Sequence, residues 1–356
     1  MTDDLPHATP RPVTPDELDL LWFCQLAADG EFLGAGPHRQ PTLPYLASLV
    51  ETASEMGFSS LLTATNFHAE HDAWTASVAT LARTQGAGLL VAVRPGMFNP
   101  AIFAKMASTA AALFPGRVRL NIVTGSNPAE NAMYGDQESH DTRYARTREF
   151  MQVLRRLWTE PVVDFAGTFY RTEGAVLAPK PSPAIPLYLG GHSAAAQQLA
   201  AELADVYLVW GDTVERISEH IANMKEHERS AGRRVRYGLR CHVVVRETEA
   251  EAWADSEGQR RQRSLATGAS LVVEDNLWAG VGLARSGVGV AIVGDPAQVE
   301  AKLRAYQALG ISTFILSGYP HLEECRRFGE LVMPRLRSSR PSAATSLGRA
   351  DVAPVT

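Results

Sequence analysis

The chain alternates short apolar runs with longer segments whose apolar residues recur at helical spacing. One such unit begins at residues 118–123, a mostly β-branched run in which Asn121 lies between two apolar residues. The small, polar stretch TGSNP ends this run, and residues 141–159 then show an amphipathic helical pattern. A buried strand that ends in hydroxyl residues and a glycine is typical of a strand whose carboxyl end faces a ligand. The sequence therefore predicts a strand, a polar loop and a helix, which form one unit of an α/β protein.

The same unit recurs along most of the chain. Further strands are predicted over residues 18–26, 58–65, 88–94, 185–189, 205–210, 235–246, 288–293 and 312–316. Further helices are predicted over residues 43–56, 73–84, 100–113, 194–203, 214–231, 248–263, 296–308 and 321–336. Strands that alternate with helices indicate a parallel sheet, and roughly eight pairs favour a closed (β/α)8 barrel of the TIM type. A doubly wound sheet is the alternative, but no GxGxxG follows the first strand.

Local signals predict several helix ends and the segments outside the regular pattern. Gly57 and Gly310 are expected to cap helices at their carboxyl ends, and Asp72 to cap the helix that follows it. Residues 162–183, rich in aromatics and prolines, suggest a hairpin-like excursion, and residues 254–287 a second insertion that would form a lid. We expect a single domain over residues 18–336. Residues 1–17 and 337–356 are expected to form a disordered arm and a disordered tail.

The composition narrows the class of protein. The chain has 356 residues, 45% of them hydrophobic, which is enough for a large core. A net charge of −5 argues against a general nucleic-acid binder, and no apolar run reaches the about 18 residues of a membrane span. The polar amino-terminal segment does not resemble a signal peptide, and the three cysteines are scattered. These features predict a reduced, cytoplasmic protein.

In a barrel of this type, the carboxyl ends of the strands form the active site. The residues predicted there are Asp29, Thr65, Asn66, His68, Glu70, His71, Arg94, Thr124, Ser126, Asn127, Gly190, His192, Ser193, Trp210, Arg240, His242, Ser317, Tyr319 and His321. This set is rich in hydrogen-bond donors, contains few carboxylates and includes no HxH or HExxH motif, so a catalytic metal is not expected. It suits an organic cofactor that carries a phosphate.

The turn from Gly190 to Ser193 is the best candidate for binding that phosphate. It leads into a helix, whose free amides and dipole would attract an anion. An ordinary turn in which Ser193 only caps the helix is equally compatible with the local sequence.

Other candidates also have structural alternatives. His242 lies within a strand and could be a hydrogen-bonded core histidine, but Arg240 shares its face, and a buried arginine needs an anionic partner. His68 and His71 could be solvated loop residues. Trp210 could belong to the core, which the local sequence slightly favours, or form a flat wall for a ligand.

Longer stretches resemble a known family. These are DGEFLG, VAVRPG, LNIVTGSNPAE, LYLGGHS, YLVWGD, YGLRCHVVVRE, NLWAGVGLARSGVGVAIVGDP and SGYPHLEE, which span nearly all of residues 20–336. In this order they resemble the bacterial luciferase-like flavin monooxygenases, and among them the alkanesulfonate monooxygenases.

The resemblance implies a TIM-type barrel that binds reduced FMN (FMNH2) from a separate NAD(P)H:FMN reductase. Oxygen (O2) would react with this flavin to give a flavin peroxide, and an alkanesulfonate would be cleaved to an aldehyde and sulfite. By position, the flavin contacts would be Asn121, Glu130, Arg143, Tyr144 and Ser193, to which the strand ends add Thr65, Thr124 and Gly191. The catalytic residues would be Arg240, His242, Arg285 and Tyr319. The substrate would contact His68, His71 and Trp210.

Three departures from the family pattern bear on the substrate. The loop NFHAEH lacks the cysteine that follows the second strand in the sulfonate enzymes, Ala27 replaces a histidine, and residues 254–275 are shorter than the family lid. Riboflavin lyase, which splits riboflavin into lumichrome and a sugar, is therefore an alternative, since this loop would suit a flat ring. A deazaflavin-dependent oxidoreductase and an inactive flavin-binding barrel are two others.

Family members form dimers or tetramers through their early helices. Residues 73–84 and 100–113 are rich in alanine and poor in charge, which suits a helix interface in a homodimer or homotetramer. The same composition would also suit helices that only pack on the barrel.

Overall fold

The structure is a computed structural model, which describes residues 18–32, 35–262, 271–284 and 289–338. The predicted arm and almost all of the predicted tail therefore lie outside the described residues, as does part of the predicted lid.

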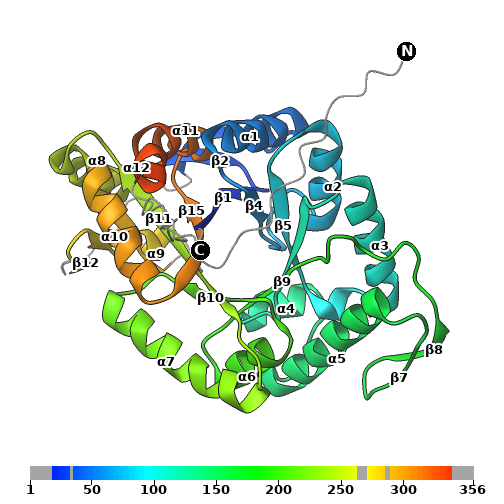
Figure 1. The fold of residues 1–356 in the computed structure, drawn as a ribbon. Coiled ribbons are helices and arrows are strands. Elements are labelled where there is room, and N and C mark those ends of the chain that lie inside the picture. The colour runs from blue at the N-terminus through cyan, green and yellow to red at the C-terminus, as the bar shows by residue number, and fades with distance from the viewer. Residues whose placement is uncertain (1–17, 33–34, 263–270, 285–288, 339–356) are drawn as a thin grey trace, which may run out of the picture.

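Eight parallel strands form the centre of the molecule (Figure 1). They are β1 (Asp19–Cys24), β4 (Ser60–Thr63), β5 (Gly88–Val93), β6 (Val118–Ile122), β9 (Leu187–Gly190), β10 (Val206–Trp210), β11 (Arg236–Val245) and β15 (Ile311–Ser317). Their order is β10-β9-β6-β5-β4-β1-β15-β11, and β10 also pairs with β11. This last pairing closes the sheet into a ring, so the predicted barrel is confirmed and the doubly wound sheet is excluded.

Helices surround this ring on the outside (Figure 1). They are α1 (Leu43–Met56), α2 (Ala73–Arg83), α3 (Pro100–Leu113), α5 (His140–Thr159), α6 (Ala194–Leu203), α7 (Val214–Ala231), α10 (Pro296–Ala308) and α11 (His321–Leu331). The predicted caps explain several of the ends. Asp72 accepts a hydrogen bond from the Thr75 amide at 2.8 Å, and Gly57 ends α1 with a φ of +94°.

Shorter elements extend the loops of the barrel. They are β2 (Asp29–Phe32), β3 (Ala35–Arg39), η1 (Pro95–Met97), α4 (Pro128–Met133), β7 (Val163–Ala166), β8 (Arg171–Ala175), α8 (Glu249–Gln262), β12 (Val272–Glu274), β13 (Leu277–Trp278), α9 (Gly280–Ala284), β14 (Ala291–Gly294) and α12 (Met333–Ser338). Strands β7 and β8 pair antiparallel, which confirms the predicted hairpin-like excursion. The β2–β3 hairpin and α4 were not predicted.

The structure corrects four details of the prediction. The apolar run at 288–293 contributes to β14, which pairs with the far end of β11 outside the closed ring. The last predicted helix is interrupted at Val332, and Arg337 still belongs to α12 rather than to a tail. Leu309, not Gly310, is the C-cap of α10, and Gly310 follows it with a φ of +104°.

The barrel interior holds a small core of its own. It consists of Leu21, Phe23, Leu62, Leu90, Tyr188, Val206, Leu208 and Ile315. A charged pair lies at its amino-terminal end, where Nη1 of Arg119 is 2.6 Å from Oδ2 of Asp19 and 3.2 Å from the Tyr188 hydroxyl. The much larger second core fills the space between the strands and the helices.

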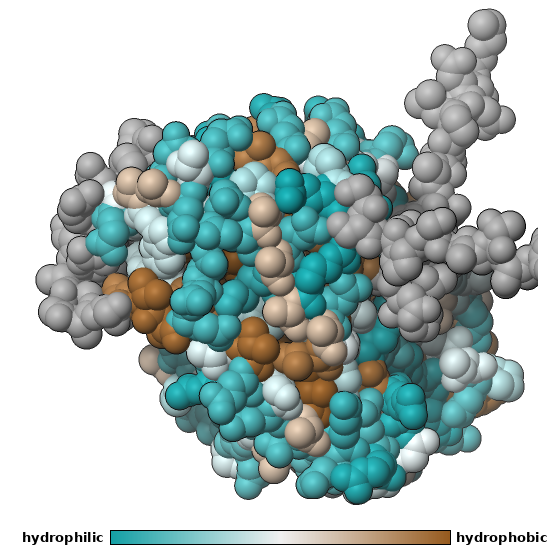
Figure 2. Space-filling view, turned by 60° about the vertical axis from the view of Figure 1, so that its left-hand side comes forward, coloured by the Kyte–Doolittle hydropathy of each residue, from teal (hydrophilic) through white to brown (hydrophobic). Residues whose placement is uncertain are grey.

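The molecular surface is mainly hydrophilic. Figure 2 shows a largely teal face, on which apolar residues gather in separate patches. Within the described ranges, every helix is too short or too polar to cross a bilayer.

Loss of the Arg119 side chain should strongly destabilise the protein. In Arg119→Met the Asp19 carboxylate stays buried without its cation, so we expect a loss of about 3–5 kcal/mol in the free energy of unfolding. Denaturant titration would measure this loss. The matched control is Arg171→Met, which breaks an ion pair whose two side chains are 74% and 73% exposed and should cost at most about 1 kcal/mol. Equal losses in both variants would contradict a structural role for the buried pair.

Candidate active site

The end of β6 turns sharply at Gly125. This residue has a φ of +87°, and a Cβ atom there would lie 2.4 Å from Oδ1 of Asn131. Only glycine fits both the backbone angle and the space. The chain then enters α4, whose first amides bond to the Asn127 side chain. The β6 loop is thus packed tightly against the short helix that follows it.

Arg94, at the end of β5, binds this helix. Its guanidinium lies 2.7 Å from the Glu130 carboxylate and donates to Oδ1 of Asn131 at 2.8 Å. It also lies 4.5 Å from the centre of the Tyr134 ring, in a cation–π contact. The Tyr134 hydroxyl in turn bonds to Thr65 at 3.2 Å. This cluster joins three neighbouring strand ends and includes two predicted cofactor contacts, Thr65 and Glu130.

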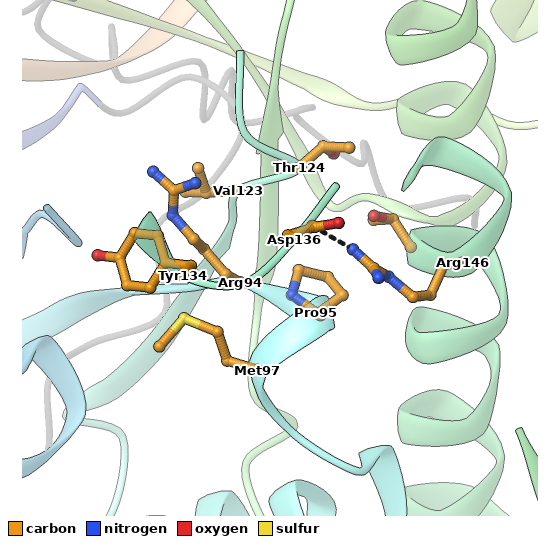
Figure 3. Close-up of a pocket in the computed structure, with 10 residues that line it drawn as sticks. Arg94, Pro95, Met97, Val123, Thr124, Tyr134, Asp136 and Arg146 are labelled. Carbon is orange, nitrogen blue, oxygen red and sulfur yellow. Dashed lines mark hydrogen bonds and ion pairs between the residues drawn. The ribbon is translucent and has the colours of Figure 1, made fainter. Parts of the chain in front are cut away.

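A small pocket lies beside this cluster (Figure 3). Arg94, Met97, Thr124 and Tyr134 line it, and an ion pair of 2.5 Å between Asp136 and Arg146 closes one side. Its volume is about 10 Å³, which is near the lower limit for one water molecule. It is therefore far too small for an organic cofactor.

Helix α5 brings Arg143 and Tyr144 to the same side of the barrel. We call this side, where the carboxyl ends of the strands lie, the rim. Arg143 donates to the carbonyl oxygens of Glu138 and Gly125, the latter at 3.2 Å, and so ties α5 to the β6 loop. The Tyr144 hydroxyl lies only 3.0 Å from where a Cβ of residue 191 would be. Arg143, Tyr144 and Gly191, all predicted cofactor contacts, are thus brought close to the β6 and β9 loops.

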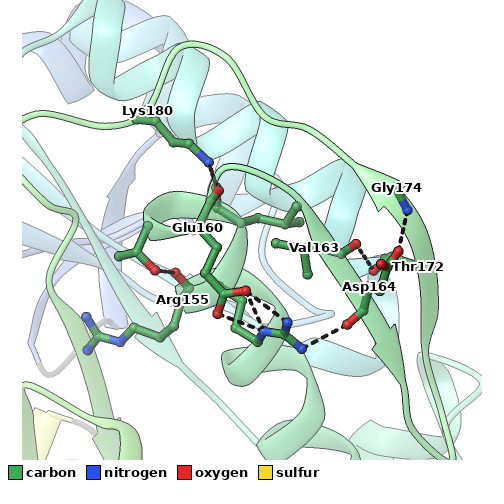
Figure 4. Close-up of polar contacts among 10 residues, drawn as sticks. Arg155, Glu160, Val163, Asp164, Thr172, Gly174 and Lys180 are labelled. Atoms are coloured by element: carbon green, nitrogen blue, oxygen red, sulfur yellow. Dashed lines mark hydrogen bonds and ion pairs between the residues drawn. The ribbon is translucent and has the colours of Figure 1, made fainter.

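The other end of α5 is fixed to the β7–β8 hairpin (Figure 4). Arg156 pairs with Glu160 at 2.9 Å and donates to the Asp164 carbonyl at 3.0 Å. Lys180 donates to the last carbonyl oxygens of α5, that of Leu157 at 2.6 Å. The excursion at residues 162–183 therefore stabilises the helix that positions the rim residues.

The turn after β9 requires glycine at position 191. Gly191 has a φ of +142°, and a Cβ there would lie 2.7 Å from that of Ala196. Ser193 caps α6, since its hydroxyl accepts from the Ala196 amide at 3.2 Å. The cap is thus present, whatever else the turn binds.

An aromatic group lies beside this turn. The rings of His192 and Trp210 are 5.8 Å apart, and His192 is 4.7 Å from His220 on α7. Partial burial and the nearby His220 lower the pKa of His192, which Asp212 partly offsets. Trp210 is 45% exposed, so it does not belong to the core, the alternative that the local sequence slightly favours, and its predicted contact with the substrate stays a prediction.

The third group of predicted residues lies deeper, on β11 and β15. Arg240 is 6% exposed, donates to the Cys241 carbonyl at 2.7 Å and stacks on Phe23 at 4.9 Å. His242 is hydrogen-bonded through Nδ1 to the Ser317 hydroxyl, and its ring lies 5.2 Å from that of Tyr319. The expected shared face of Arg240 and His242 is thus the inside of the barrel. Carbonyl oxygens and an aromatic ring are among the partners of the buried arginine.

A buried carboxylate lies at the start of α11. Asp29 accepts hydrogen bonds from the Tyr45 hydroxyl at 2.5 Å and from the His321 amide at 3.0 Å. Burial raises the pKa of the Asp29 carboxyl, although these two bonds partly offset the effect. Asp29 thus links the β2–β3 hairpin to the start of α11.

Not every predicted residue joins these groups. His68 is exposed, and His71 bonds to the Pro41 carbonyl at 2.8 Å, next to the start of α1. Arg285 lies outside the described residues. In the part of the chain that the structure describes, no three potential ligands lie close enough to hold a metal ion.

Sequence reasoning missed two members of the rim, Asn131 and Tyr134. Asn131 lies in α4 and Tyr134 is its C-cap, and this helix is too short to show helical periodicity. The signal that was present is Asn127 followed by Pro128, a cap residue and a proline at the first helical position.

The fold recurs in known proteins. A riboflavin lyase solved with modified FMN and riboflavin is 17% identical, with a TM-score of 0.76 over 90% of this chain and 92% of that one. EDTA monooxygenase from Chelativorans sp. BNC1 is 18% identical, with a TM-score of 0.75 over 90% and 94%. An F420-dependent secondary alcohol dehydrogenase is 20% identical, with a TM-score of 0.68 over 90% and 99%. At these identities the likeness shows the fold alone.

The sequence itself matches a family. Residues 20–313 match the family described as luciferase-like monooxygenase. This range covers most of the chain. It contains the barrel strands from β1, without its first residue, to β11, and it ends within β15. The chain therefore belongs to the luciferase-like monooxygenase family.

Proposed function

We propose that the protein is a monooxygenase that uses FMNH2 and O2. The observation that carries the proposal is the rim itself, where the glycine turn before α6, the β6 loop and the start of α5 lie close together. The family to which the chain belongs is one of monooxygenases. Reduced flavin, when bound, would supply the electrons with which one oxygen atom of O2 is inserted into the substrate.

The residues of the rim fit a flavin. Three buried polar atoms near Gly125 have no hydrogen-bond partner within the described residues: Oγ1 of Thr124, Nδ2 of Asn131 and Nε of Arg143. Such atoms are costly unless a ligand or water pairs with them. A flavin ring has carbonyl oxygens and ring nitrogens along its edge, so it would complement this mixture of donors and acceptors.

The phosphate of FMN would bind at the glycine turn. The Ser193 hydroxyl accepts a bond from Ala196, so its own proton remains available to an anion. The first amides of α6 lack intrahelical partners, and the helix dipole adds a partial positive charge. Gly191 allows the backbone to approach closely beside Tyr144.

The deeper residues would act on the substrate. The bond between His242 and Ser317 holds the imidazole in one orientation, and Tyr319 packs against it. Arg240 provides a permanent positive charge in the wall of the barrel. Together with Arg285, these residues would stabilise negative charge and exclude water.

We favour an alkanesulfonate as the substrate, cleaved to an aldehyde and sulfite. Cationic and hydroxyl donors suit a sulfonate, and the motifs noted above resemble that subfamily most. Riboflavin is the second candidate, because the loop at 66–71 lacks the cysteine of the sulfonate enzymes and carries the exposed ring of Phe67. A deazaflavin could replace FMN, and competitive titration of the two would separate these cofactors.

Two partners belong to this proposal. An NAD(P)H:FMN reductase would deliver FMNH2 transiently, and the alanine-rich helices α2 and α3 would form the interface of a homodimer or homotetramer. Sedimentation of the purified chain would test the assembly.

Ser193→Gly should weaken FMN binding selectively. Glycine is nearly as good a helix cap as serine, so α6 should persist while the hydroxyl contact to the phosphate is lost. We expect the Kd of FMN to rise about tenfold, as for a lost hydrogen bond to a charged group. Fluorescence titration would measure it. Riboflavin, which lacks the phosphate, is the matched ligand, and an equal loss for both flavins would contradict the phosphate site.

The reaction itself can be tested with a generic flavin reductase, NADH, FMN and O2. We expect sulfite and aldehyde from a panel of alkanesulfonates, in amounts that depend on the reductase. A parallel reaction with riboflavin would be assayed for lumichrome. Lumichrome without sulfite would replace the sulfonate reaction by the lyase reaction. If neither product forms, both proposed substrates are wrong.

A further inference from the structure

Phe67 is a large apolar side chain that the protein leaves in solvent. It lies in the loop after β4 and is 52% exposed. The loop is nevertheless held in place, since the Phe67 amide donates to Oε1 of Glu130 at 3.3 Å and the His68 amide donates to Asn66 at 2.8 Å. A single exposed apolar side chain is ordinary on a protein surface, but the loop that carries this ring is held by defined hydrogen bonds.

The ring is supported from one side by Tyr134. The two rings lie 5.0 Å apart at an interplanar angle of 90°, which is a favourable edge-to-face arrangement. Tyr134 is itself fixed, because Thr65 bonds to its hydroxyl and the Arg94 guanidinium packs on its ring.

Arg94 completes this support. It is 8% exposed and is held by the Glu130 carboxylate and by Asn131. The same carboxylate therefore holds both the loop of Phe67 and the cation behind Tyr134. A ring that is fixed before a ligand arrives loses little entropy when the ligand stacks on it.

Phe67 lies on the side of the barrel where a substrate would bind. The loop follows the carboxyl end of β4, so it lies on the rim where the barrel binds its ligands. In the closed ring, β4 and β10 are four strands apart in either direction, so they lie opposite each other. Trp210, at the end of β10, is also an exposed aromatic residue of the rim. A ligand over the mouth would thus have an aromatic ring on either side.

We propose that Phe67, supported by Tyr134, is a stacking surface for a planar aromatic ring of the acceptor substrate. The inference rests on the proposed monooxygenase function and specifies its substrate as an alkanesulfonate that also carries an aromatic or heteroaromatic ring, rather than a purely aliphatic one. A fixed, flat ring buries most area against another flat ring, whereas an alkyl chain covers it incompletely.

Two sulfonates of similar carbon content provide a matched pair of probes. Naphthalene-2-sulfonate carries a planar ring and octane-1-sulfonate does not. Their Kd values would be measured by calorimetry on the full chain saturated with FMN. The variants are Phe67→Ala, Phe67→Leu and Phe67→Tyr, and the control is Val176→Ala, a 70% exposed residue beyond the β7–β8 hairpin.

We expect Phe67→Ala and Phe67→Leu to raise the Kd of naphthalene-2-sulfonate about fivefold to tenfold. Phe67→Tyr and Val176→Ala should leave it within about twofold, and octane-1-sulfonate should change less than about twofold in all variants. Such a pattern would show that binding requires a flat ring at position 67. An apolar side chain of another shape, or a general effect on folding, would not produce it.

Several results would overturn the inference. These are equal losses for the two probes, no loss in Phe67→Ala, or no binding of naphthalene-2-sulfonate to the unmodified protein. A selective loss of FMN affinity would also overturn it, since Phe67 would then contact the cofactor. Probe binding needs no turnover, so a failure of the monooxygenase assay is a separate result that concerns the proposed function alone.

Discussion

The parallel pairing of β10 with β11 is the constraint on which the rest of the structure depends. It joins Val206–Trp210 to Arg236–Arg240 and so removes the two open edges that eight strands would otherwise have. Because every pairing around the closed ring is parallel, all the strands point their carboxyl ends to the same side. Residues that are more than 200 positions apart, such as Thr65 and Tyr319, therefore share one rim without any direct attraction between them.

Closure also fixes which side chains enter the barrel, because successive residues of a strand face opposite sides. On β11 the alternation sends Arg240 and His242 inward and Cys241 into the outer core. A polar residue inside is tolerated only where it finds partners. Arg119 finds a carboxylate at the amino-terminal end, while Arg240 uses carbonyl oxygens and the Phe23 ring nearer the mouth. The two arginines thus have different surroundings, which suit the first to stability and the second to the proposed role at the substrate.

The sequence was sufficient for much of this architecture. Helices such as α3 and α6 have clear start signals, a proline at the first position or a serine cap, and their ends were predicted as observed. The β2–β3 hairpin was missed because residues 29–39 show neither alternation nor helical spacing. The exposure of Trp210 depends on what packs around the end of β10, and the partners of Arg240 include a carbonyl 75 positions away. Such properties arise from packing in three dimensions, so local patterns carry no record of them.

The cluster around Arg94 has a consequence for how specificity can change. Asn131, which Arg94 holds, lies where a side chain at position 125 would be, so Gly125 is confined between Arg94 and α4. Arg143 also donates a hydrogen bond to the carbonyl oxygen of this same glycine. Glu130 meanwhile supports both Arg94 and the Phe67 loop. The proposed acceptor surface and the proposed flavin loop therefore share one support. A substitution that reshapes the acceptor loop by disturbing Glu130 would also loosen the cofactor loop, whereas a change confined to the exposed ring of Phe67 would not. We infer that new acceptors are reached most easily through position 67.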